Sequence, residues 1–472
     1  MLRILLAITI SFLGACAVEV IGIATGDEPT AMGWPAPMSN ADAWKVMPAA
    51  KQGQGAELPT WARMLAREAP RTAAAFLELD LAQRTRSPVE PGLRSGMRYV
   101  AAKANGCSYA TVTAAADAKR AGVTAEKLAS LDTQEYAAWS PTERFALQFA
   151  HDMTLNSDGV TDEQFAKLVE LFSDRQAAAM VLAMAYANFQ DRFLICLGAP
   201  IEENGPLPPV VVKFASDTLT KTTTPPPANK KPDIPGAKPE INKDIIEDDG
   251  EFTWLPYEQL QNRLQQQRDR TTRLPIPEWS VFADRLPQGL MEKPSDIIWY
   301  KIAFGYADEL AVPFEIYLRT AGAEISSNWD RAFGNCIFWM VTDAVKCPYC
   351  MGHCEMNWEV MGMDTTQIAD LSQKLAGNDW SSFTEPQQQA LAFARKLTRT
   401  PSKVTREEIE ALRKGFGDQR AFFICLQASR YNYMTRISNG FQLTLEKGNP
   451  FWDYYRMPTP SVPSEKQESP KR

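Results

Sequence analysis

The sequence predicts an all-α protein made of two tandem helical domains, and three observations favour this fold. Apolar residues recur at helical spacing through most of the chain, as Leu65, Ala69 and Phe76 do. No convincing run of alternating apolar and polar residues predicts a strand between the helical segments. The stretch 347–354 aligns with 107–114 at a constant offset of 240, which indicates a duplicated unit.

The repeat continues well beyond these eight positions. Gly122 pairs with Gly362 at the same offset, and after about four extra residues in the second copy the offset becomes 244. Matching positions in the later register are Phe149 and Phe393, Val160 and Val404, Asn188 and Asn432, and Arg192 and Arg436. A match over such a length is a duplicated domain and not a chance motif. Whether the two copies pack together or hang apart on a linker stays open at this point.

The first 24 residues are expected to be an export signal. Met1-Leu2-Arg3 is a short positive start, and an apolar run from Ile4 to Val18 follows it. Leu13-Gly14-Ala15-Cys16 resembles a bacterial lipobox, so Cys16 is a candidate for lipidation. Cleavage after Ala17 and an uncleaved anchor are the alternatives. The protein is therefore expected to be exported and periplasmic, or anchored to a membrane through its N-terminus alone.

The rest of the chain divides by composition. Residues 25–57 are rich in Gly, Pro and Ala and are expected to be extended, and residues 58–198 form the first helical domain. Residues 199–250 turn to Pro, Thr, Lys, Asp and Glu, which predicts a disordered linker. The second helical domain covers 251–456, and Pro277-Glu278-Trp279 in it echoes Pro59-Thr60-Trp61. The tail, 457–472, is expected to be disordered.

In the first domain, helices are expected over 59–83, 94–104, 109–120, 142–154, 162–172 and 175–197.

The formal net charge of −7 and the lack of a clustered Lys/Arg segment argue against nucleic acid as a partner. Eight cysteines in 472 residues are too few for a disulfide scaffold. Cys336, Cys196 and Cys425 lie in apolar helical runs and are interpreted as buried packing residues.

The cysteine cluster of the second copy is the main candidate for chemistry. Pro348 lacks a backbone donor and is best tolerated in the first helical turn, so it predicts a helix that begins there with Cys347 as its cap. Cys350 then lies in the first turn, where the helix dipole is expected to lower its thiol pKa. Cys350 is the candidate thiolate, and Cys347 is close enough to form a disulfide with it.

These features resemble the AhpD-like, carboxymuconolactone decarboxylase-like superfamily. The resemblance rests on Cys347-Pro348-Tyr349-Cys350 at a helix start, Gly362 a dozen residues later, Leu391-Ala392-Phe393-Ala394, and Asn432 with Arg436. It covers roughly residues 60–197 and 275–445, and it implies an all-helical homo-oligomer. Members with the cysteine pair are alkylhydroperoxidase-type peroxidases or disulfide reductases, whereas the decarboxylases proper do without that pair.

For this sequence the resemblance implies that Cys350 attacks a small peroxide, that Cys347 resolves the product, and that a thiol or dithiol reductant restores the pair without a cofactor. The family's proton-relay glutamate falls on Asn335, or on Ser95 in the first copy. The relay histidine falls on Cys354, with His353 one residue early. His353 is therefore a catalytic candidate. Cys354, Asn335, Asp343 and Glu355 are auxiliary candidates, the last two because either could supply a carboxylate.

Two other functions compete with thiol chemistry. Cys347, Cys350, His353 and Cys354 are also suitable ligands for Zn²⁺, although four ligands from one eight-residue stretch would strain a tetrahedral site. A non-catalytic assembly protein is the third interpretation. The first copy has Ala110 and Ala114 where thiols would be, so it is interpreted as a degenerate scaffold domain.

Overall fold

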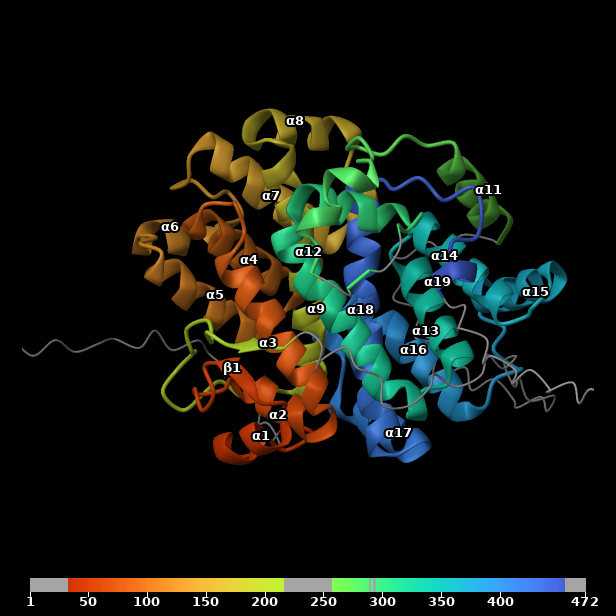
Figure 1. Cartoon of the computed structure of the whole chain (residues 1–472), viewed down its shortest axis with the longest axis horizontal. Coiled ribbons are helices and arrows are strands. Elements are labelled where there is room, and N and C mark those ends of the chain that lie inside the picture. The colour runs from red at the N-terminus through yellow and green to blue at the C-terminus, as the bar shows by residue number, and fades with distance from the viewer. Residues whose placement is uncertain (1–32, 216–256, 288–289, 292–293, 455–472) are drawn as a thin grey trace, which may run out of the picture. The chain divides into compact units, whose positions relative to one another are not determined.

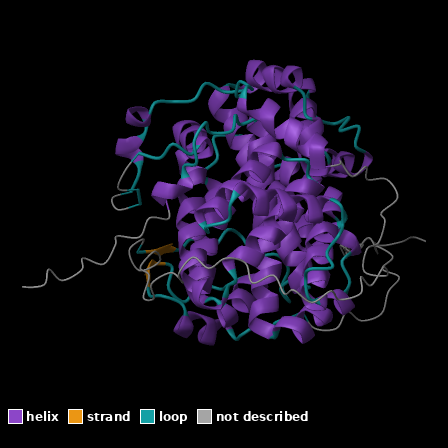
Figure 2. Ribbon diagram, turned by 90° about the vertical axis from the view of Figure 1, so that its right-hand side faces the viewer, coloured by secondary structure: helices purple, strands orange, loops and turns teal. Residues whose placement is uncertain are grey.

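The computed structural model describes residues 33–215, 257–287, 290–291 and 294–454. The predicted export signal, the lipidation candidate Cys16 and the C-terminal tail lie outside the described residues. Helices make up most of the described chain, and its strands, β1 (Ala50–Gln52) and β2 (Lys213–Phe214), form one antiparallel pair (Figure 2). The predicted all-α class is therefore confirmed.

The first repeat contains nine α-helices among the described residues. They are α1 (Asn40–Val46), α2 (Thr60–Glu68), α3 (Pro70–Thr85), α4 (Pro91–Asn105), α5 (Ser108–Arg120), α6 (Ala125–Ser130), α7 (Pro141–Leu155), α8 (Asp162–Phe172) and α9 (Asp174–Leu197). Short 3₁₀ turns, η1 (Leu131–Thr133) and η2 (Ser157–Gly159), follow α6 and α7. Side-chain caps define several starts, as at α7, where Ser140 and Glu143 form a reciprocal capping box.

The second repeat begins with α11 and is again helical. Its helices are α11 (Tyr257–Arg268), α12 (Ile298–Ile325), α13 (Arg331–Ala344), α14 (Pro348–Val360), α15 (Thr365–Ala376), α16 (Glu385–Arg399), α17 (Arg406–Phe416), α18 (Asp418–Phe441) and α19 (Phe451–Tyr454). The 3₁₀ turns are η4 (Trp279–Val281), η5 (Ala283–Arg285), η6 (Ser326–Asn328) and η7 (Pro401–Lys403).

The helix bounds follow the register seen in the sequence. α14 begins and ends 240 residues after α5, whereas α16, α17 and α18 each begin and end 244 residues after α7, α8 and α9. The four extra residues fall between these groups, where α15 is longer than α6. Apart from α6 and α15, helices of the same length follow one another in the same order, so both copies adopt the same helical arrangement in this region.

The start of the second repeat differs from the echo noted in the sequence. Trp279 lies in a 3₁₀ turn, whereas Trp299 occupies the place in α12 that Trp61 occupies in α2. α12 also contains a kink at Ala307 (φ −148°, ψ 54°), close to the conformation of Ala69 (φ −150°, ψ 76°) between α2 and α3. α12 therefore corresponds to α2 and α3 together, and the predicted match of Pro277-Glu278-Trp279 is wrong.

Two predicted boundaries also change. Within 25–57, which was expected to be extended, Ser39 caps α1 and Trp44 is buried. Residues 199–215, which the composition assigns to the linker, belong to the folded first repeat, because Val212 and Phe214 are buried and β2 pairs with β1. A local composition rich in Pro and Gly does not exclude burial when a neighbouring domain offers an apolar surface.

The two repeats pack together along α9 and α18, which lie side by side (Figure 1). The Arg192 guanidinium donates to the carbonyl of Thr398 at 2.8 Å, and the Arg436 guanidinium donates to the carbonyl of Thr154 at 3.3 Å. Each repeat thus binds the same turn of the other. The described residues from Gly33 onward form one compact unit, so the two copies pack together and do not hang apart on a linker.

Candidate functional site

The cysteine pair lies where α14 begins. Cys347 is the N-cap residue and Pro348 is the first helical residue, as the sequence predicts. The backbone N–H of Cys350 donates to Cys347 Sγ at 3.4 Å, which places the two cysteines within one turn. Both are free thiols and both are buried. This geometry suits a pair that alternates between dithiol and disulfide.

Cys350 faces α18 rather than solvent. Its Sγ lies 3.2 Å from Ser438 Oγ, and Ser438 in turn donates to the carbonyl of Met434 at 2.8 Å. Burial raises the pKa of Cys350 well above its usual value, and the neighbouring Cys347 raises it further, whereas Ser438 lowers it. The expectation of a lowered pKa is therefore wrong, because the loss of hydration outweighs the favourable field of the helix N-terminus.

His353 forms a buried hydrogen bond with a glutamate outside the cysteine motif, a contact that sequence reasoning missed. Its Nε2 lies 2.7 Å from Glu446 Oε2, and the ring packs between Tyr349 and Phe451. Glu446 also accepts hydrogen bonds from the Tyr349 hydroxyl at 2.7 Å and from the Ile298 backbone at 2.8 Å. Burial opposes ionisation of Glu446, but these contacts prevail and hold its pKa below the usual value.

The first repeat contains the same glutamate. Glu202 accepts from the Tyr109 hydroxyl at 2.6 Å and from the Thr60 backbone at 2.8 Å. Glu202 and Glu446 are 244 residues apart, which is the register of the later helices, so extending the repeat alignment past α9 would have found them. Thr113 occupies the place of His353 in this copy. The glutamate is therefore a shared structural element to which only the second repeat adds a histidine.

Three auxiliary candidates that the structure describes, Asn335, Asp343 and Glu355, form no hydrogen bond with the His353–Glu446 pair. The Asn335 amide donates to the backbone carbonyl of Cys354 at 2.8 Å and so joins α13 to α14. Glu355 accepts from Gln261 and Ser372. Asp343 lies in the last turn of α13, where burial raises its pKa to about 7 against the opposing effect of Arg395 and Lys346. Among the described residues neither carboxylate hydrogen-bonds to Cys350 or His353.

The proposed zinc ligands do not converge. No three His, Cys, Asp or Glu side chains in the described part of the chain are placed to hold a metal ion, and Cys347, Cys350, His353 and Cys354 all belong to that part. His353 is turned towards Glu446 instead. This arrangement therefore gives the zinc alternative no support.

The corresponding place in the first repeat is a cavity of about 50 Å³. Its wall includes Tyr109, Ala110, Thr113 and Ala114, the counterparts of Tyr349, Cys350, His353 and Cys354. The small side chains that replace the thiols leave this space open. A volume of this size has room for a few water molecules or a small organic molecule.

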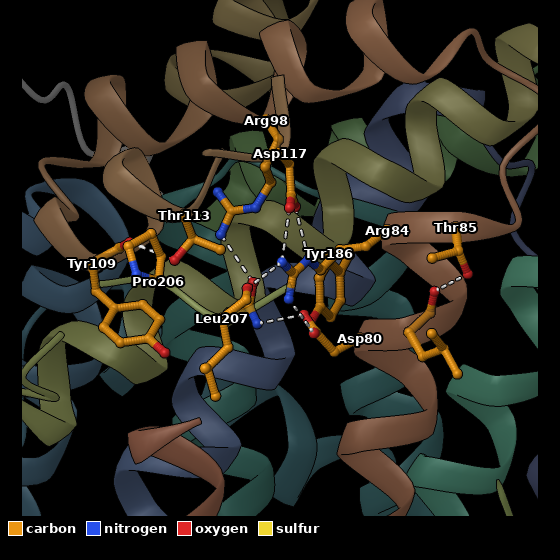
Figure 3. A network of polar contacts seen from close by, with 12 residues as sticks. Asp80, Arg84, Thr85, Arg98, Tyr109, Thr113, Asp117, Tyr186, Pro206 and Leu207 are labelled. Carbon is orange, nitrogen blue, oxygen red and sulfur yellow. Dashed lines mark hydrogen bonds and ion pairs between the residues drawn. The ribbon is translucent and has the colours of Figure 1, made fainter. Parts of the chain in front are cut away.

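Charged residues line this cavity (Figure 3). Arg84 pairs with Asp80 at 3.2 Å and with Asp117 at 2.8 Å, and the Tyr186 hydroxyl donates to Asp80 at 2.7 Å. Arg98 binds Gln190 and forms a short ion pair with Asp191.

Three polar groups of this wall remain unpaired. Arg98 Nη1 and both polar atoms of Gln83 are buried without a hydrogen-bond partner. Such groups are costly to bury unless a bound water or ligand satisfies them. The first repeat is therefore organised around a polar cavity.

Comparison with known proteins agrees with the fold. The model of the carboxymuconolactone decarboxylase family matches residues 70–152, which run from α3 into α7 and include part of the cavity wall. The superfamily resemblance fits this match. No curated protein matches the chain. Within the described residues, no helix has the length and apolar character needed to cross a membrane.

Proposed function

We propose that the second repeat is a thiol-dependent oxidoreductase of the carboxymuconolactone decarboxylase-like class. One observation carries the proposal: Cys347 and Cys350 share the first turn of α14, and His353, in the next turn of the same helix, is hydrogen-bonded to Glu446. The superfamily resemblance of the Cys-x-x-Cys adds support, since members with this pair reduce hydroperoxides or disulfides.

The proposed cycle consumes one peroxide and two thiol equivalents. The Cys350 thiolate attacks the terminal oxygen of an organic hydroperoxide; the O–O bond breaks, an alcohol leaves, and Cys350 becomes a sulfenic acid. Cys347 then displaces water from that sulfenic acid to form the Cys347–Cys350 disulfide. An external thiol or dithiol reduces the disulfide and is itself oxidised.

The proton on Cys350 must leave before attack, because the thiolate is the nucleophile. Ser438 can rotate its hydroxyl from Met434 towards the sulfur and stabilise the anion. His353, one helical turn from Cys350 and held by Glu446, is the proposed proton acceptor. Since Cys350 is only 2% exposed, entry of a peroxide requires a local opening of the helices that cover it.

The test is peroxide consumption by the full chain with a dithiol donor. We expect Cys350→Ser to abolish turnover, and we expect Cys347→Ser to stop after one equivalent and leave a sulfenic acid on Cys350, detectable by mass spectrometry. Cys107→Ser is the matched control, because Cys107 caps α5 as Cys347 caps α14 but has no second thiol. Equal turnover by wild type and Cys350→Ser would remove the assignment and favour an assembly role.

A second candidate function belongs to the first repeat. The unpaired Arg98 Nη1 and Gln83 amide line a cavity in the segment that matches the decarboxylase family, whose members proper lack the cysteine pair. We propose that this cavity binds a small carboxylate. Thermal-shift measurements with short mono- and dicarboxylic acids test it: stabilisation should be lost in Arg98→Met and kept in Cys350→Ser, and no stabilisation by any acid would refute it.

A further inference from the structure

A second cavity lies between the two repeats. Its volume is about 250 Å³, and its walls contain equivalent residues of both copies, including Thr154 with Thr398 and Arg192 with Arg436. It is therefore built jointly by the ends of α7 and α16 and by the central helices α9 and α18. It shares no lining residue with the cavity of the first repeat, which α3, α4, α5 and α9 line.

The charge of this cavity has one sign. Five basic residues line it and no Asp or Glu does; the basic residues are Arg192, Lys346, Arg399, Lys403 and Arg436. Hydroxyl and amide side chains, such as those of Ser157 and Asn105, form much of the remaining wall. A recess with low-dielectric walls and a single sign of charge concentrates the opposite ion.

Arg192 and Arg436 are buried cations without a carboxylate partner. They are 1% and 3% exposed. Apart from the bonds to the other repeat, Arg192 donates to Asn105 and Asn188, and Arg436 donates to Asn432 and Thr435, all of which are neutral acceptors. Among the described residues neither arginine forms an ion pair.

Each of these two arginines also has a buried Nε without a hydrogen-bond partner. The nearest acid in sequence, Asp191, is already engaged by Arg98 and Asn105. Asp191 therefore acts on Arg192 only through space, and neither guanidinium has a hydrogen-bonded carboxylate in the described part of the chain. Buried charges of this kind are costly unless a counter-ion is bound.

The excess charge comes from the second repeat. Lys346, Arg399 and Lys403 replace Gly106, Leu155 and Gly159 of the first copy. Lys346 also keeps the left-handed conformation (φ 54°) that Gly106 adopts with φ 68°. A non-glycine residue pays about 1 kcal/mol or more for that conformation. A lysine at such a position indicates that its positive charge contributes to the function of the cavity.

We propose that this cavity binds a small polyanion, a molecule bearing two or more phosphate or carboxylate groups, with Arg192 and Arg436 at its floor and Lys346, Arg399 and Lys403 around its entrance. Guanidinium and ammonium groups surrounded by hydroxyls recognise both of these anions. The ligand would neutralise the two buried arginines and thereby strengthen the contact between the repeats. The cavity uses none of the residues assigned to the thiol chemistry of α14, but it adjoins that site, because Lys346 directly precedes Cys347.

Calorimetric titration of the full chain at low salt tests the proposal, with inorganic pyrophosphate and citrate as separate probes for the two anion chemistries. We expect saturable binding of at least one probe and an increase in melting temperature on binding. The triple variant Lys346→Gly, Arg399→Leu and Lys403→Gly restores the first copy's residues at the entrance. It should bind the probe at least about tenfold more weakly, because three of the five charges are gone.

The control is a triple variant with the same change in net charge at exposed positions elsewhere, Lys45→Ala, Lys167→Ala and Lys414→Ala. It should bind as the wild type does. Equal weakening in both triple variants would show a non-specific charge effect, and no saturable binding of either probe would also overturn the proposal. Peroxide turnover in the entrance variant, measured in parallel, distinguishes a failed anion site from a damaged thiol site.

Discussion

At the scale of single residues, the environment of each candidate decides its chemistry more than its type does. Cys350 has the sequence position of an activated thiol, yet burial raises its pKa, and the one hydroxyl beside it belongs to Ser438. Glu446 lies outside the cysteine motif, yet it holds His353. Contacts between distant parts of the chain therefore define the candidate site.

The role of Ser438 can be measured directly. Removing its hydroxyl takes away the group that lowers the pKa of Cys350, so in Ser438→Ala we expect Cys350 to form its disulfide with Cys347 more slowly after peroxide addition at neutral pH. A rise of one pKa unit corresponds to about a tenfold loss of thiolate. The control is Ser429→Ala, since Ser429 donates to its own helix at Cys425 and touches neither thiol. Equal rates in both variants would show that Ser438 has no part in activation.

Asp343 predicts an unusual dependence of stability on pH. Burial raises its pKa to about 7 in the folded protein, so the folded state retains a proton that the unfolded chain releases near pH 4. Its contribution to stability is complete below about pH 4 and is lost as the pH rises towards 7. Asp343→Asn keeps the neutral form at every pH.

The measurement is urea unfolding at pH 5 and pH 8. The free energy of unfolding of Asp343→Asn should change less between these values than that of the wild type, by roughly 1 to 4 kcal/mol. Asp370→Asn, at an exposed position in α15, controls for the loss of a surface carboxylate. The same pH dependence in wild type and Asp343→Asn would contradict the raised pKa.

At the scale of elements, the close approach of α18 to the first repeat depends on small residues. A Cβ at Gly440 would lie 2.7 Å from Val181 Cγ1 and 2.9 Å from Met153 Cε. Gly440→Ala is therefore expected to destabilise the fold by about 1 to 3 kcal/mol in urea unfolding, because the helices must move apart. Gly322→Ala in α12, where nothing lies within 4 Å, should instead stabilise by about 0.5 to 1 kcal/mol. Stabilisation by both changes would contradict the close packing.

At the scale of the whole molecule, the repeats depend on each other. Each sends a buried arginine to a carbonyl of the other, and aromatic pairs such as Phe189 with Tyr317 and Phe193 with Phe422 cross the same interface. Calorimetry of the full chain should therefore show one cooperative unfolding transition. Two resolved transitions, each matching a separately expressed repeat, would contradict this.

Local pattern in the sequence was sufficient for the all-α class, the helix register and the start of α14 at Pro348. Periodicity and capping are properties of neighbouring residues, so no distant contact is needed to read them. The match of Trp279 with Trp61 failed because a short sequence similarity does not fix the position of a residue in the fold: Trp279 lies in a 3₁₀ turn and Trp61 in α2.

What the sequence determined by itself was therefore the duplicated helical framework and the presence of a cysteine pair in only one copy. The tertiary structure alone decided that Glu446 holds His353 and that the first repeat has a charged cavity where thiols are missing. It also decided that two buried arginines without a hydrogen-bonded carboxylate among the described residues line a cavity between the copies. Hydration and charge partners depend on which distant residues pack together, and that packing cannot be read from local spacing.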